Sequence, residues 1–82
     1  MALEAKDLTP EQHTAIENWW IENDPSGYSF ECNDNHRYAI KGNAEQEADY
    51  ETRQNNGCCG FVDVELELPD GSILLYGFNY GH

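Results

Sequence analysis

The segment from Phe61 to Tyr80 has the clearest pattern of apolar and polar positions in the chain. Two apolar runs flank Pro69-Asp70-Gly71, where proline suits the first corner of a type I turn and glycine suits the left-handed position after it. This pattern predicts a β-hairpin with a bulge at the glycine, in which Leu68 faces Ser72. Counting outward from the turn predicts the pairs Leu66 with Leu74, Val64 with Tyr76 and Val62 with Phe78.

The two faces of this hairpin differ in polarity, because successive side chains of a strand point to opposite sides. The paired residues above form an apolar face. The other face carries three carboxylates with two apolar side chains among them, and these residues are Asp63, Glu65, Glu67, Ile73 and Leu75. We expect this second face to be solvated once a helix covers the first.

An amphipathic helix is predicted from position 10 to about position 23. Thr9 suits the N-cap, Pro10 suits the first helical position, and Gln12 can close a capping box with Thr9. The proline-containing stretch 24–27 ends the helix, because the residue before a proline avoids the α region. The apolar side chains share one side of the helix, and they are Ile16, Trp19 and Trp20.

The middle of the chain predicts a second hairpin, with strands at Tyr28–Cys32 and Arg37–Lys41 around a polar turn at positions 33–35. Residues 44–57 leave two alternatives open. Their composition favours a helix capped by Asn43, whereas their carboxylates alternate with other residues at the period of a strand. These carboxylates are Glu45, Glu47, Asp49 and Glu51.

These elements together predict an α+β fold, in which the amphipathic helix packs on one face of a four-stranded antiparallel sheet built from two hairpins. The 82 residues suit a single domain, and residues 1–8 lack periodicity, so we expect a flexible arm there. The sequence has neither an apolar run long enough to span a membrane nor the pattern of a signal peptide. We therefore expect a cytoplasmic protein.

The cysteines and histidines are the candidate metal ligands of the sequence. Cys32 and His36 are separated by three residues, and Cys58, Cys59 and His82 could complete a site. Adjacent cysteines, however, cannot easily direct both sulfurs at one tetrahedral ion, and an odd number of cysteines argues against a disulfide framework. We expect reduced, buried thiols without a metal or a cofactor.

Catalysis is not expected either. Nothing in the sequence places a histidine beside a cysteine, as an activated thiol would require. The carboxylates of Glu65 and Glu67 are roughly 6.5 to 7 Å apart on an open strand face, where neither is desolvated enough for acid-base work. The polar stretch at positions 33–35 is too short for a calcium-binding loop of the EF-hand type. We expect a protein that is not an enzyme.

The charge of the chain limits its partners. Sixteen acidic residues against four basic ones give a formal net charge of −12, which opposes direct binding to nucleic acid or to an anionic membrane. One interpretation of the two acidic rows is a solvated surface that confers solubility. The other is a partner-binding surface that displays negative charge at near-regular intervals, as a DNA backbone does. That surface would comprise Asp63, Glu65, Glu67, Ile73, Leu75, Glu45, Glu47, Asp49 and Glu51.

In size, acidity and lack of a catalytic motif, the chain resembles small inhibitors encoded by phages and mobile elements, including anti-CRISPR and anti-restriction proteins, several of which imitate nucleic acid. The resemblance implies a partner in the bacterial cytoplasm, a nuclease or CRISPR effector whose nucleic-acid groove is blocked. The chain is also similar to immunity proteins that neutralise nuclease toxins, and a non-catalytic acidic adaptor is a third alternative. An open sheet edge leaves a homodimer possible.

Overall fold

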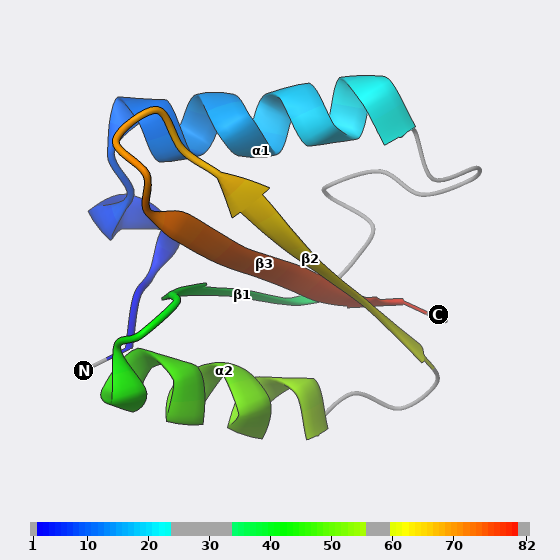
Figure 1. Cartoon of the computed structure of the whole chain (residues 1–82). Helices are drawn as coiled ribbons and strands as arrows, with labels where there is room; N and C mark the ends of the chain where they lie inside the picture. The colour runs from blue at the N-terminus through cyan, green and yellow to red at the C-terminus, as the bar shows by residue number, and fades with distance from the viewer. Residues whose placement is uncertain (1, 24–33, 56–59, 81–82) are drawn as a thin grey trace.

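The computed structural model describes residues 2–23, 34–55 and 60–80 (Figure 1). Its elements, in chain order, are a short 3₁₀ helix Ala5–Asp7, α1 Pro10–Asn23, β1 Asp34–Ile40, α2 Ala44–Asn55, β2 Gly60–Glu67 and β3 Ile73–Tyr80. The strands form one antiparallel sheet in the order β1-β3-β2. The predicted α+β class is confirmed. The fourth predicted strand, Tyr28–Cys32, lies outside the described residues.

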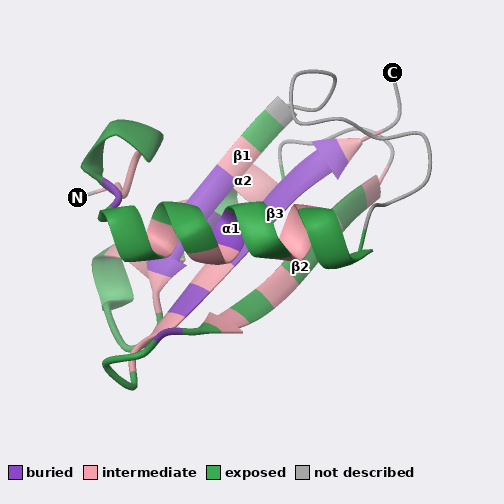
Figure 2. Cartoon of the chain, turned by 90° about the horizontal axis from the view of Figure 1, so that it is seen from above, coloured by how far each residue is buried: buried purple, intermediate pink, exposed green. Residues whose placement is uncertain are grey.

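The sheet lies between the two helices, with α1 on one face and α2 on the other (Figure 1). The expectation that the face bearing Asp63, Glu65 and Glu67 is left entirely to water is therefore wrong. α2 packs mainly against β1, so it covers one side of that face and leaves β2 open. Figure 2 shows the result: β3 is largely buried, whereas β2 alternates between half-buried and exposed positions.

The predicted register of the β2–β3 hairpin is confirmed in every pair. The Leu68 N–H donates to the Ser72 carbonyl at 2.9 Å, and the Gly71 N–H donates to the Leu68 carbonyl at 3.0 Å. Gly71 has φ +90°, a conformation that favours glycine. Turn chemistry and strand period agree here, and this agreement fixes which side chains share each face of β2.

Helix α1 begins with both hydrogen bonds of the predicted capping box. The Gln12 N–H donates to Thr9 Oγ1 at 3.2 Å, and the Thr9 N–H donates to Gln12 Oε1 at 2.9 Å. Trp20 Nε1 donates to Tyr76 Oη at 2.9 Å, which ties the helix to the central strand. The core between α1 and the sheet consists of Leu8, Ile16, Tyr38, Leu68, Leu74, Tyr76 and Phe78, with Trp19 and Trp20 packed against it.

Residues 44–55 adopt the helical alternative. The side chain of Asn43 accepts a hydrogen bond from the Gln46 N–H at 3.1 Å, as an N-cap does. Tyr50 is the buried side chain of α2, and it packs on the sheet face that also buries Arg37 and Ala39. The carboxylates of β2 suggest a solvated face, whereas the complete burial of Arg37 lets a second helix pack there.

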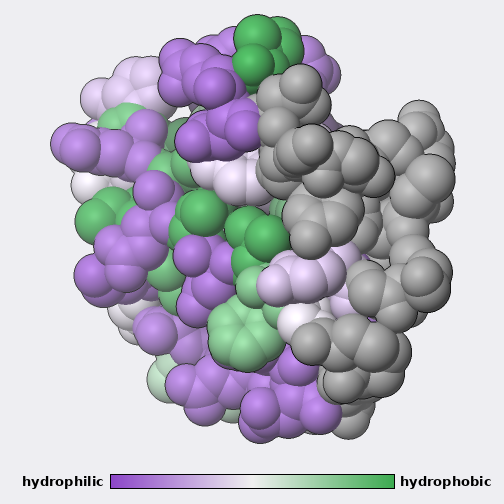
Figure 3. All heavy atoms as spheres, turned by 90° about the vertical axis from the view of Figure 1, so that its right-hand side faces the viewer, coloured by the Kyte–Doolittle hydropathy of each residue, from purple (hydrophilic) through white to green (hydrophobic). Residues whose placement is uncertain are grey.

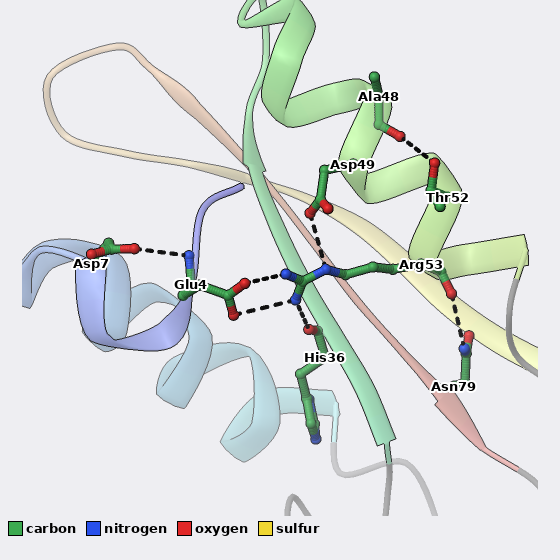
Figure 4. Close-up of polar contacts among 8 residues, drawn as sticks. All are labelled: Glu4, Asp7, His36, Ala48, Asp49, Thr52, Arg53 and Asn79. Atoms are coloured by element: carbon green, nitrogen blue, oxygen red, sulfur yellow. Dashed lines mark hydrogen bonds and ion pairs between the residues drawn. The ribbon is translucent and has the colours of Figure 1, made fainter. Parts of the chain in front are cut away.

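The N-terminal segment is docked by one arginine of α2 (Figure 4). The guanidinium of Arg53 binds both carboxylate oxygens of Glu4, donates to the His36 carbonyl at 3.4 Å and pairs with Asp49 at 3.0 Å. Leu3 forms a β-bridge with Tyr38, and Leu8 is buried. These contacts come from isolated residues, so the sequence, which predicts a flexible arm here, contains no periodic signal for them.

The pH dependence of stability tests the docking of this segment. Hydrogen bonds from Arg53 hold the pKa of Glu4 below its ordinary value of 4.5. The stabilisation is therefore present above that ordinary value and is lost as the pH falls through the lowered value. We expect Glu4→Gln to lower the free energy of unfolding by about 0.5 kcal/mol at neutral pH, since the pair is partly exposed. Urea unfolding should show that this difference shrinks as the pH is lowered below 4.5. Glu17→Gln, at an exposed position on α1, is the control for the loss of a carboxylate.

A pair of leucines tests the position of the core. Leu74 is completely buried, whereas Leu66, its partner across the hairpin, is half-buried because β2 is the outermost strand of the sheet that the described residues form. Leu74→Ala should lower the free energy of unfolding by about 2 to 5 kcal/mol, and Leu66→Ala should cost less than half as much. Thermal unfolding measures both, and equal losses would contradict the arrangement of the core.

Candidate partner-binding surface

Two elements bring carboxylates together in the structure. The side chains of Glu47 and Glu51 lie one turn apart on the same side of α2, and Asp63 and Glu65 lie on the facing side of β2. Between them is a groove of about 170 Å³, which we call the acidic groove. It is lined by Glu47, Tyr50, Glu51, Gln54, Asp63, Glu65 and Leu75.

The remaining predicted site residues do not line the acidic groove. Asp49 points to Arg53 on another side of α2 (Figure 4), and Glu45 is exposed in the first turn. Glu67 and Ile73 lie at the end of the hairpin, beyond the groove. The sequence shows Glu45, Glu47, Asp49 and Glu51 at alternate positions. The helical period places Glu47 and Glu51 on one side of α2 and Glu45 and Asp49 on another.

Tyr50 connects the two walls of the groove, because its hydroxyl donates a hydrogen bond to the Asp63 carboxylate. Burial, and secondarily this hydrogen bond, raise the pKa of Tyr50 far above its ordinary value. The phenol therefore stays protonated at neutral pH and acts as a donor. Glu65, further along β2, is paired with Lys41 at 3.4 Å. Two of the four carboxylates are thus held in position by other side chains.

Beneath the groove lies the completely buried side chain of Arg37. It donates to Asn79 Oδ1 at 3.0 Å and to the Val62 carbonyl at 2.8 Å. Its guanidinium also lies 5.0 Å from the centre of the Tyr50 ring and 5.7 Å from that of Phe61, within the range of cation–π attraction. Arg37 therefore supports the helix side and the strand side of the groove at once.

Gly77 makes room for this arginine at the centre of the sheet. A Cβ atom at that position would lie 2.5 Å from the Val62 carbonyl oxygen, 2.7 Å from Arg37 Nη2 and 2.8 Å from Tyr50 Oη. The roles of Tyr50, Gln54 and Arg37 in this region were not predicted from the sequence. The signal in the sequence that could have indicated them is Gly77, because a glycine inside a strand often marks the close approach of another group.

Most basic side chains of the sequence are engaged within the fold. Arg37 is buried, Arg53 is paired with Glu4 and Asp49, and Lys41 is paired with Glu65. Three of the four basic side chains in the sequence are therefore engaged within the fold. Exposed carboxylates dominate the acidic groove and its surroundings.

Within the described ranges, no three His, Cys, Asp or Glu side chains are arranged to hold a metal ion. Across residues 2–23, 34–55 and 60–80, no helix is both long and apolar enough to cross a membrane. Cys32, Cys58, Cys59 and His82, the candidate zinc ligands besides His36, lie outside these ranges.

The buried arginine supplies a test of the scaffold under the groove. Lysine cannot reproduce two separate hydrogen bonds in a fixed planar geometry, so Arg37→Lys should lower the free energy of unfolding by about 1 to 3 kcal/mol. Lys41→Arg is the matched control, because it exchanges the same two residue types at an exposed position. It should change the free energy of unfolding by less than about 0.5 kcal/mol. Urea unfolding of the two variants makes the comparison, and equal effects would contradict a supporting role for Arg37.

Comparison with known proteins identifies no relative of this chain, because no family model, no curated protein and no solved structure matches it.

Proposed function

We propose that this protein is a non-catalytic acidic inhibitor that binds the basic nucleic-acid-binding groove of a bacterial nuclease or CRISPR effector and blocks it. The observation that carries the proposal is the acidic groove itself. Its carboxylates belong to two adjacent elements, and Leu75 lies between them. A partner that normally binds nucleic acid offers the complementary surface of Arg and Lys.

The spacing of the charges supports this proposal. Alternate residues of β2 are separated by roughly 6.5 to 7 Å along the strand. Glu47 and Glu51 are separated by about 6 Å along the helix axis, at 1.5 Å per residue. The two walls therefore present negative charge at nearly equal intervals, as a nucleic-acid backbone presents phosphates to the side chains that bind it.

Rigidity and exposed apolar surface support it further. The carboxylates of Asp63 and Glu65 are held by Tyr50 and Lys41, so less conformational freedom is lost on binding. Phe61, beside the groove on β2, is half exposed. Apolar side chains among charges are typical of protein-binding surfaces, and a surface that served solubility alone would not need them.

Charge reversal within the groove tests the proposal. The variant combines Glu51→Lys with Glu65→Lys and leaves Asp63 in place, because Asp63 accepts the hydrogen bond from Tyr50. The control combines Glu17→Lys on α1 with Glu45→Lys on α2, which are exposed and lie outside the acidic groove, and it changes the net charge by the same amount. Against a partner captured from a bacterial lysate, we expect the groove variant to bind about 100-fold more weakly and the control to bind within a few fold of the parent, because like charges then meet at the groove alone.

Competition decides between blocking and other modes of inhibition. DNA or guide RNA should displace the protein from the captured partner, and raising the salt concentration should weaken the complex by screening the attraction. Simultaneous occupancy by nucleic acid and this protein would contradict the proposal. It would favour an immunity protein that binds beside the active site, or an adaptor.

A further inference from the structure

The outer edge of β2 is unpaired in the described part of the chain, because β2 is the last strand in the order β1-β3-β2. The Leu68 N–H bonds to Ser72 across the hairpin, and in an antiparallel pair every second residue bonds to the same neighbour. Leu66, Val64 and Val62 therefore direct their backbone groups to β3. The backbone groups of Asp63, Glu65 and Glu67 point to the unpaired edge.

A second groove, of about 530 Å³, follows this edge between α1 and β2. Its lining includes Trp19 of α1, Leu66 on the face of β2 that meets α1, and Glu65 and Glu67 on the opposite face. Since side chains from both faces of one strand line it, the groove contains the strand edge itself. We call it the edge groove.

Apolar surface remains accessible along β2, both in the edge groove, which Leu66 lines, and beyond it. Val62, Val64 and Leu66 are only half-buried, because α1 does not cover the full width of β2. On the face shown in Figure 3, apolar side chains lie among hydrophilic ones. A row of half-buried apolar side chains beside unpaired backbone groups is suited to an additional strand.

Charge limits which strand can bind there. The groove is rimmed by Glu11 and Glu22 of α1 and by Glu65 and Glu67 of β2. A second copy paired antiparallel through β2 would place carboxylates directly opposite carboxylates, which is destabilising. The acidic rim therefore opposes self-pairing and favours a basic segment.

We infer that the β2 edge accepts an extended segment of a partner protein in which basic and apolar residues alternate. Residues that pair across strands share a face. The basic side chains of the segment then lie opposite Asp63, Glu65 and Glu67, while its apolar side chains meet Val64, Leu66 and Trp19. The inference rests on the proposed function for the basic character of the partner, and it does not require that nucleic acid be displaced.

The probe is a seven-residue peptide of alternating lysine and valine, titrated against the isotope-labelled protein. At saturation, hydrogen exchange of the Asp63, Glu65 and Glu67 amides should slow by about tenfold or more, since these N–H groups acquire acceptors. The amides of Val62, Val64 and Leu66, already bonded to β3, should change little. A peptide with the same composition but four lysines followed by three valines should bind about tenfold more weakly.

Substitution of Glu65 separates backbone pairing from charge. Glu65→Pro removes an N–H that points to the unpaired edge, and proline is tolerated in edge strands. It should weaken peptide binding by about tenfold or more relative to Glu65→Gln, which loses the same charge and keeps the N–H.

Methylated peptides provide the same test without altering the protein. One peptide is N-methylated at its valine amides and the other at its internal lysine amides. Because alternate amides of a strand point to opposite sides, one peptide should lose binding and the other should keep it.

Equal binding of the two methylated peptides, or unchanged exchange at Asp63, Glu65 and Glu67, would overturn the inference. The outcome is separable from that of the proposed function. Strand pairing at β2 by a protein that fails to displace nucleic acid would overturn the proposed function alone. Displacement of nucleic acid without strand pairing would overturn this inference alone.

Discussion

The fold depends on the burial of a single cation, Arg37, between the sheet and α2. A buried charge costs several kcal/mol unless it is hydrogen-bonded; two guanidinium nitrogens of Arg37 are hydrogen-bonded, whereas Nε has no partner among the described residues. Here the guanidinium starts on β1, passes Gly77 of β3 and reaches the Val62 carbonyl of β2, with Asn79 as a second acceptor. One side chain therefore crosses the whole sheet, and the aromatic ring of Tyr50 covers it.

This constraint explains how α2 is attached. In contrast to α1, which packs through an aromatic and aliphatic core, α2 buries one tyrosine and otherwise relies on polar contacts. Gln46 accepts from the Ile40 N–H and Glu47 accepts from the Gly42 N–H, both at 2.8 Å. The α2 wall of the acidic groove is therefore held in place mainly by hydrogen bonds, whereas the β2 wall belongs to a hairpin. The hydrogen bond between Tyr50 and Asp63 joins the two walls.

Local patterns in the sequence predicted the parts of the fold that local chemistry determines. The hairpin register follows from the turn at Pro69-Asp70-Gly71 together with the period of two, and the start of α1 follows from Thr9 and Gln12. The second helix was ambiguous, because carboxylates at alternate positions also suit a strand. Its docking was missed, since it depends on contacts from Arg37 to Val62 and Asn79 that are 25 and 42 residues away in sequence. The same limit applies to the site: Glu47, Glu51, Asp63, Glu65 and Leu75 were predicted, whereas Tyr50 and Gln54 were not.

The glycine at the centre of β3 also has a consequence for how sequences with this fold can diverge. A side chain at position 77 would displace the guanidinium of Arg37, and loss of the guanidinium would leave the Val62 carbonyl and Asn79 without this donor. Substitutions at positions 37, 77 and 79 are therefore tolerated only in compatible combinations. In a set of related sequences, this interior trio would vary least and could be mistaken for a binding site, while the carboxylates at the surface would be free to change one at a time with the partner.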